Sequence, residues 1–83
     1  MWVNKMIGKV LKYMRTKNNL SQEELSNLIY IKQNTLSRYE TETNDINFET
    51  IEKIANKCGY KIYFENSNFK DKFESKDILR KDI

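Results

Sequence analysis

The sequence contains no histidine, no proline, two glycines and a single cysteine. Histidine is the commonest general base and transition-metal ligand, so its absence weighs against both kinds of site. One cysteine excludes an internal disulfide and a cysteine metal cluster within one chain. The few glycines and the lack of proline favour helices joined by short turns. We therefore expect no metal, no cofactor and no enzymatic role.

Long hydrophobic runs are also missing. No apolar stretch approaches the roughly 18 residues that a membrane-spanning helix needs, and the first residues lack the apolar stretch of a signal peptide. The chain of 83 residues is short enough for one domain. Its hydrophobic share of 39% and charged share of 33% are typical of a soluble helical domain. We expect a reducing, cytoplasmic location.

The positive charge is unevenly distributed. The net charge is +3, but residues 1–40 hold seven basic and three acidic residues, whereas residues 41–66 hold three basic and five acidic residues. A basic face suits a phosphate backbone. The alternative is a solvated, lysine-rich surface without a partner.

Periodic apolar residues predict a series of helices. In the first, Ile7, Val10, Leu11 and Met14 follow the spacing i, i+3, i+4, i+7 of one helical face. Ser21 and Glu24 form a capping-box pattern at the start of the second. Asn4 and Asn47 are candidate N-caps of the first and fourth helices, and Gly59 is a left-handed C-terminal stop. The predicted helices are residues 4–18, 22–29, 33–40 and a stretch from about 48 to 58.

After Gly59 the period changes to two. Residues 60–65 alternate in hydrophobicity, which predicts a strand. The pattern contains no second strand candidate, so the expected partner is the same strand of another copy across a two-fold axis. The alternative is an extended tail or the start of another helix. The expected dimer interface is Tyr60, Ile62, Tyr63 and Phe64.

The chain divides at residue 66. Residues 1–66 are expected to form the domain with its terminal strand. Residues 67–83 are polar and mixed in charge, which predicts either disorder or a weak amphipathic helix.

Residues 21–40 contain two short helical patterns almost end to end. A helix, a turn of three to four residues and a second short helix form the helix-turn-helix arrangement. Its second helix presents N-terminal side chains to base edges in the major groove. This explains why polar residues begin the third helix while Leu36 and Tyr39 point inward. In a dimer the two such helices would lie about 34 Å apart, one turn of DNA.

These residues resemble the lambda-repressor-like, Xre-type helix-turn-helix family. The resemblance covers residues 7–59 and rests on an ordered set of short matches: 20–25, Ile31, 35–40, 48–51 and 54–55. It implies an all-α bundle of four to five helices; the short C-terminal β-strand, expected to pair across a dimer, is a departure from many simple repressor domains of this type. It also implies binding of double-stranded DNA and transcriptional repression. The strand gives a looser resemblance to the HipB-like antitoxins.

The resemblance also implies residue roles. Gln22 matches a phosphate-contacting position, and Gln33 and Asn34 match base-reading positions. Arg15 and Glu40 match a structural ion pair that ties the first helix to the end of the third. The expected DNA-binding residues are Gln22, Lys32, Gln33, Asn34, Thr35, Ser37 and Arg38, with Lys17 and Asn44, and more weakly Asn18 and Thr43, as backbone contacts.

The sequence departs from the family pattern in the turns. Tyr30 stands where the family usually has glycine, so either Tyr30 adopts a left-handed conformation or the turn is reshaped. Lys32 replaces a common serine cap, and Thr41 replaces a common glycine.

Three functions compete at this point. The first is a sequence-specific repressor that acts as a homodimer on an inverted repeat. The second is an antitoxin that controls its own operon and binds a toxin through residues 67–83. The third is a protein-interaction module that has lost DNA binding.

Overall fold

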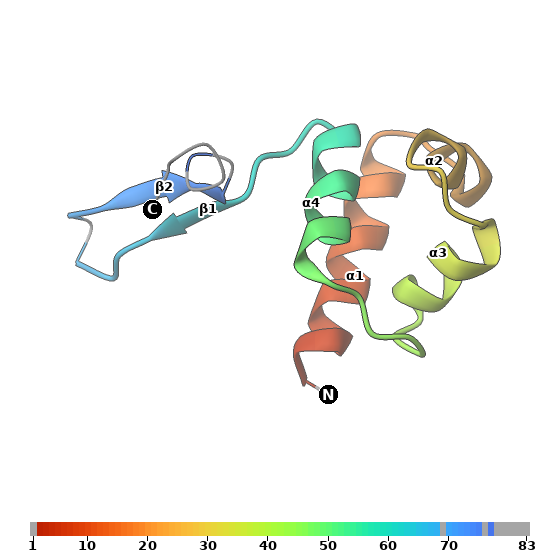
Figure 1. Cartoon of the computed structure of the whole chain (residues 1–83), viewed down its shortest axis with the longest axis horizontal. Coiled ribbons are helices and arrows are strands. Elements are labelled where there is room, and N and C mark those ends of the chain that lie inside the picture. The colour runs from red at the N-terminus through yellow and green to blue at the C-terminus, as the bar shows by residue number, and fades with distance from the viewer. Residues whose placement is uncertain (1, 69, 76, 78–83) are drawn as a thin grey trace.

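The computed structural model describes residues 2–68, 70–75 and 77. Over these residues, helices α1 to α4 precede strands β1 and β2. The helices pack into one body, and the strands form an arm on the side away from α3 (Figure 1). The expected bundle with a C-terminal strand is confirmed. The elements are α1 Trp2–Lys17, α2 Gln22–Leu28, α3 Gln33–Glu40, α4 Phe48–Lys57, β1 Tyr63–Glu65 and β2 Lys72–Glu74.

The core draws on each of these helices. Leu11 of α1, Leu25 of α2, Leu36 of α3 and Ile54 of α4 all have 0% exposure. Truncating a leucine or isoleucine at such a position to alanine typically costs about 2–5 kcal/mol. The body is therefore held together by apolar contacts between helices, of which α2, α3 and α4 are too short to be stable alone.

Two predictions about α1 are wrong. The helix begins at Trp2, so Asn4 lies inside it and does not cap it. Val10, expected in the core, is 46% exposed, while Leu11 and Met14 are buried. The spacing of Val10 fits the apolar stripe, but the residue remains partly exposed to solvent.

Side-chain hydrogen bonds explain where α2 and α4 start. The Ser21 hydroxyl accepts the backbone N–H of Glu24 at 3.0 Å, and the Glu24 carboxylate accepts the N–H of Ser21 at 2.8 Å. The Asn47 side chain accepts the N–H of Thr50 at 2.8 Å. Lys32 gives no side-chain cap to α3. The predicted caps of α2 and α4 are therefore confirmed.

The described helices end in the same C-terminal capping motif. At the end of α4, the N–H of Tyr60 donates to the Ala55 carbonyl at 2.8 Å, and the N–H of Gly59 donates to the Asn56 carbonyl at 3.1 Å. This pair of bonds is the Schellman motif, which needs a residue with positive φ. The corresponding residues are Asn19 (φ 58°), Tyr30 (φ 61°), Glu42 (φ 69°) and Gly59 (φ 88°).

The strand does not depend on another copy of the chain for a partner. β1 pairs antiparallel with β2, with Phe64 opposite Phe73. The prediction that this chain has no second strand is wrong, and residues 72–74 extend instead of forming a helix or a disordered tail. Three residues are too few to show a reliable alternating pattern. The predicted strand is also shorter than expected, because Tyr60 and Ile62 precede β1 and pack against the helical core.

Polar and aromatic contacts fix the arm to α4. The Ser75 hydroxyl donates to the Glu52 carboxylate, and both residues are buried. The N–H of Ser75 donates to the Ile62 carbonyl at 2.9 Å. The Phe64 ring lies 5.5 Å from Phe73 and 6.2 Å from Phe48, measured between centroids. The arm is therefore attached through the first half of α4.

Candidate nucleic-acid interface

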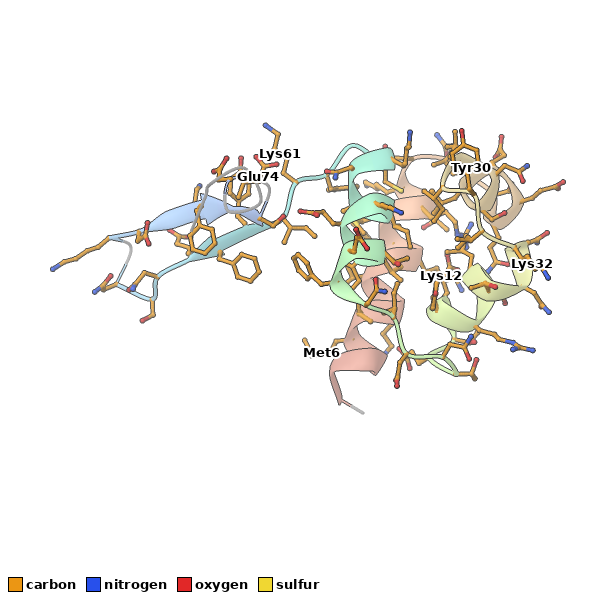
Figure 2. All side chains as sticks on the ribbon, in the orientation of Figure 1. Met6, Lys12, Tyr30, Lys32, Lys61 and Glu74 are labelled. Carbon is orange, nitrogen blue, oxygen red and sulfur yellow. The ribbon has the colours of Figure 1, made fainter. Side chains whose placement is uncertain are left out.

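Helix α3 has a buried side and an exposed front. Leu36 and Glu40 are buried, and Tyr39 is half-buried against the core. Lys32, at the N-cap, projects away from the helical body (Figure 2). The residues that follow it, Gln33 and Asn34, are exposed. The start of the helix thus offers a lysine and two amide side chains to a partner.

A buried ion pair fixes the end of α3. The Arg15 guanidinium donates to both carboxylate oxygens of Glu40, from Nε at 2.6 Å and from Nη2 at 3.0 Å. The third guanidinium nitrogen, Nη1, donates to the Leu20 carbonyl at 2.9 Å. This geometry matches the pairing that the family resemblance implies. It ties α1, the α1–α2 turn and α3 together at one point.

Gln22 joins the same network. Its amide nitrogen donates to Glu40 Oε1 at 3.0 Å, and the residue is half-buried. An amide nitrogen carries two hydrogens, so this contact uses one of them. The first residue of α2 is therefore held against the last residue of α3.

The ion pair also affects the charge of α3. Glu40 is the acidic residue of this helix, and Arg15 offsets its charge inside the protein. The exposed part of α3 then carries Lys32 at its start and Arg38 in its last turn. Both charges favour an anionic partner such as a phosphate backbone.

The remaining expected DNA-binding residues differ from one another in how exposed they are. Thr35 and Ser37 are half-buried on α3, whereas Arg38 is exposed. Lys17 is exposed at the end of α1, and Asn44 is half-buried in the loop between α3 and α4. The weaker candidates are already engaged: the Asn18 amide donates to the Met14 carbonyl, and the Thr43 hydroxyl donates to the Arg38 carbonyl.

Gly8 positions the site and was not identified from the sequence. A β-carbon at Gly8 would lie 2.6 Å from Cγ of Glu42 and 2.7 Å from the backbone oxygen of Glu40. Only glycine allows α1 to approach the end of α3 this closely. The available signal was a glycine inside an amphipathic helix, where glycine is unfavourable unless close packing requires it.

Cys58 does not form a reactive site. It is 4% exposed, and burial raises the pKa of its thiol, with a partly opposing effect from the Arg15 charge and a further increase from Glu40. A raised pKa keeps the sulfur as the weakly nucleophilic thiol at neutral pH. Within the described residues, no group of three or more His, Cys, Asp or Glu side chains is placed to hold a metal ion. None of the described helices combines the length and apolar character of a bilayer-spanning helix.

The fold and the exposed front of α3 define a helix-turn-helix DNA-binding domain. A helix-turn-helix family model matches residues 11–64, which include α2, the turn and α3. The chain belongs to this family, in the lambda-repressor-like, Xre-type class that its sequence resembles. Members of the class are DNA-binding regulators.

Among known proteins, the chain is similar to the antitoxin PezA of Streptococcus pneumoniae serotype 4 (strain ATCC BAA-334 / TIGR4). The two are 40% identical over 52 residues, which are 63% of this chain and 33% of PezA. The chain thus matches about a third of the length of that relative. The antitoxin name agrees with the looser resemblance to HipB-like antitoxins. No solved structure gave a significant match to the chain.

Proposed function

We propose that the protein is a sequence-specific transcriptional repressor that binds an inverted-repeat operator as a homodimer. The observation that supports this most directly is the exposed polar front of α3 on a helix whose end is fixed by the Arg15–Glu40 pair. A reading helix must be held rigidly, because each good contact to a base edge depends on position and angle. The protein would act on DNA in the cytoplasm and would have no enzymatic role.

In this proposal the residues of α3 have distinct roles. Gln33 and Asn34 enter the major groove, where either amide can pair with adenine through two hydrogen bonds. Phosphates or a flanking base are contacted by Lys32, Thr35 and Arg38. Ser37 lies one helical turn after Gln33 and Asn34. The second N–H of Gln22 donates to a phosphate while the first stays on Glu40. Lys17 and Asn44 add backbone contacts outside α3.

The dimer would form through the arm. β1 is paired with β2 along one edge, and its other edge presents backbone groups that a second β1 can match across a two-fold axis. Tyr63 is 50% exposed and Phe64 is 46% exposed, so both can contact a partner. Tyr60 and Ile62 support the strand from the core side instead. A two-fold dimer explains an inverted repeat, because each copy reads one half.

A second candidate function is that of an antitoxin. The favouring observation is the name of the related protein PezA. Here the same domain would bind its own operator, and residues 67–83 would bind a toxin. Co-purification with the product of a neighbouring gene, lost when the chain is cut at Ser67 while binding to a single operator half-site persists, would support this role.

The decisive experiment is selection of binding sites from a random duplex pool at a stated salt concentration. The wild-type protein is compared with Gln33→Ala/Asn34→Ala and with Asn56→Ala, which removes an exposed amide from α4. We expect a palindromic motif from wild type and Asn56→Ala, and no base preference from the double variant. Identical, purely salt-sensitive binding by all three proteins would rule out reading by α3.

A further inference from the structure

Tyr30 combines a strained backbone with an exposed ring. Its φ of 61° lies in the left-handed region, and its side chain is 94% exposed. A bulky side chain rarely occupies this region, where glycine and asparagine predominate. The ring gains little from burial here, so its presence has no evident benefit for folding. A strained residue without a folding benefit is a reason to look for a binding role.

An open groove lies beside Tyr30. It has a volume of about 410 Å³ and is lined by the end of α2 and the second half of α4. Ile29 is buried, whereas Leu28 is 44% exposed. The lining residues are Leu28, Ile29, Tyr30, Lys53, Asn56 and Lys57.

The charges of this groove have one sign. Lys53 and Lys57 are its charged lining residues, and both are exposed. They are four residues apart on α4, so they lie on the same helical face, one turn apart. The groove therefore presents apolar surface from α2 beside two positive charges from α4.

The groove is separate from the proposed DNA-reading surface. Its lining residues come from the end of α2, the turn after it and α4, and none of them belongs to α3. A DNA phosphate could pair with Lys53 or Lys57, but a nucleic acid backbone would leave the apolar surface of Leu28 and Tyr30 uncovered. An occupant must therefore supply both apolar side chains and negative charges.

We propose that this groove docks an acidic, amphipathic segment of a partner protein. An apolar side chain of the segment packs between Leu28 and Tyr30, above Ile29. Its carboxylates pair with Lys53 and Lys57 along α4. Helix-in-groove recognition works in this way, with anchors at i, i+3, i+4 and i+7. The segment binds while the front of α3 remains available for DNA.

The test uses a labelled synthetic peptide with Leu and Phe at helical anchor positions and Asp or Glu elsewhere. Fluorescence anisotropy measures its binding to the full chain, with a scrambled peptide of equal composition as the reference. The test variants are Tyr30→Gly, which removes the ring and suits the positive φ, and Lys53→Gln/Lys57→Gln. The control is Lys9→Gln/Lys12→Gln, which removes two exposed lysines from α1.

We expect the amphipathic peptide to bind at least tenfold more tightly than the scrambled one. Each test variant should lose at least fivefold in affinity, while the control variant and DNA binding stay unchanged. In an NMR titration, the amide signals of Leu28 and Ile29 should shift. Equal binding of both peptides, equal loss in the control variant, or no binding at all would overturn the proposal. Self-association of the chain that Tyr30→Gly abolishes would also overturn it, because a second copy would then be the occupant.

Discussion

At the scale of single residues, the Arg15–Glu40 pair is a buried ion pair that ties α1 to the end of α3. Glu40 accepts from Arg15 through both oxygens and from Gln22 through one, and its side chain is 2% exposed. Each charge is stabilised by the other, since neither has much access to water. Removing one partner therefore costs more than the pair itself contributes.

This asymmetry leads to the first prediction. Glu40→Ala should lower the free energy of unfolding by about 3–5 kcal/mol, because the Arg15 charge is left buried without its partner. Urea unfolding followed by circular dichroism gives the value. The matched variant Arg15→Met/Glu40→Leu removes both charges and should recover much of the loss. Coincident unfolding curves for Glu40→Ala and wild type would show that the pair does not stabilise the fold.

Replacing Tyr30 with glycine is expected to stabilise the fold, in contrast to Glu40→Ala. Its left-handed backbone costs roughly 1–2 kcal/mol for a residue with a β-carbon, and glycine offsets part of that gain by its greater freedom in the unfolded chain. Tyr30→Gly should therefore raise the free energy of unfolding by about 1 kcal/mol. Tyr30→Ala keeps the β-carbon and removes the ring, so it should change stability little. A destabilising effect of Tyr30→Gly in thermal melts would mean that the exposed ring contributes to folding.

At the scale of elements, neighbouring residues in the sequence determine where α2 and α4 start. The arrangement of the helices depends instead on contacts between residues far apart in the sequence. The caps at Ser21 and Asn47 involve residues three positions apart, so short sequence patterns reveal them. The Arg15–Glu40 pair spans 25 positions, and family resemblance rather than periodicity indicated it. β2 has three residues and exists because β1 and Glu52 are beside it. Such a contact leaves almost no local signal in the sequence.

Gly8 shows how one position sets the distance between two helices. In Gly8→Ala, better helix propensity would contribute about 1 kcal/mol, but the new β-carbon would meet the Glu40 carbonyl at 2.7 Å. The backbone oxygen cannot move without moving the end of α3. Overpacking typically costs about 1–3 kcal/mol, so we expect a net destabilisation of up to about 2 kcal/mol and weaker operator binding.

Denaturant unfolding and a DNA titration measure these two effects. Lys9→Ala, at the next and exposed position of α1, is the control and should change neither. Gly8→Ala that is as stable as Lys9→Ala would show that α1 and α3 can separate without loss.

At the scale of the whole molecule, the arm and the reading helix lie on opposite sides of the helical body (Figure 1). The residues with 0% exposure lie in the helices, so the body has a core that does not include the arm. The arm is instead attached by the Ser75–Glu52 hydrogen bond and by contacts among the Phe48, Phe64 and Phe73 rings. The proposed reading of DNA and the proposed pairing of two copies thus involve separable parts of the chain.

A chain that ends at Asn66 tests this separation. It loses β2 and the hydroxyl that bonds to Glu52, while the helical core is retained. Helical circular dichroism should therefore persist. Without β2 to hold it, β1 should no longer pair across a two-fold axis, so the truncated protein should be monomeric by analytical ultracentrifugation.

Operator affinity should also reveal the loss of the dimer. A dimer binds both half-sites together, whereas a monomer binds each half independently and loses the gain in effective concentration, which can reach about a hundredfold or more. The truncated protein should therefore bind an inverted repeat and a single half-site with similar affinity, while the full chain prefers the repeat. Ser75→Ala keeps β2 but removes its hydrogen bond to Glu52. Its preference for the inverted repeat over a single half-site should lie between those of the full chain and the truncated protein. Undiminished preference for the inverted repeat in the truncated protein would place the dimer interface on the helices instead of the arm.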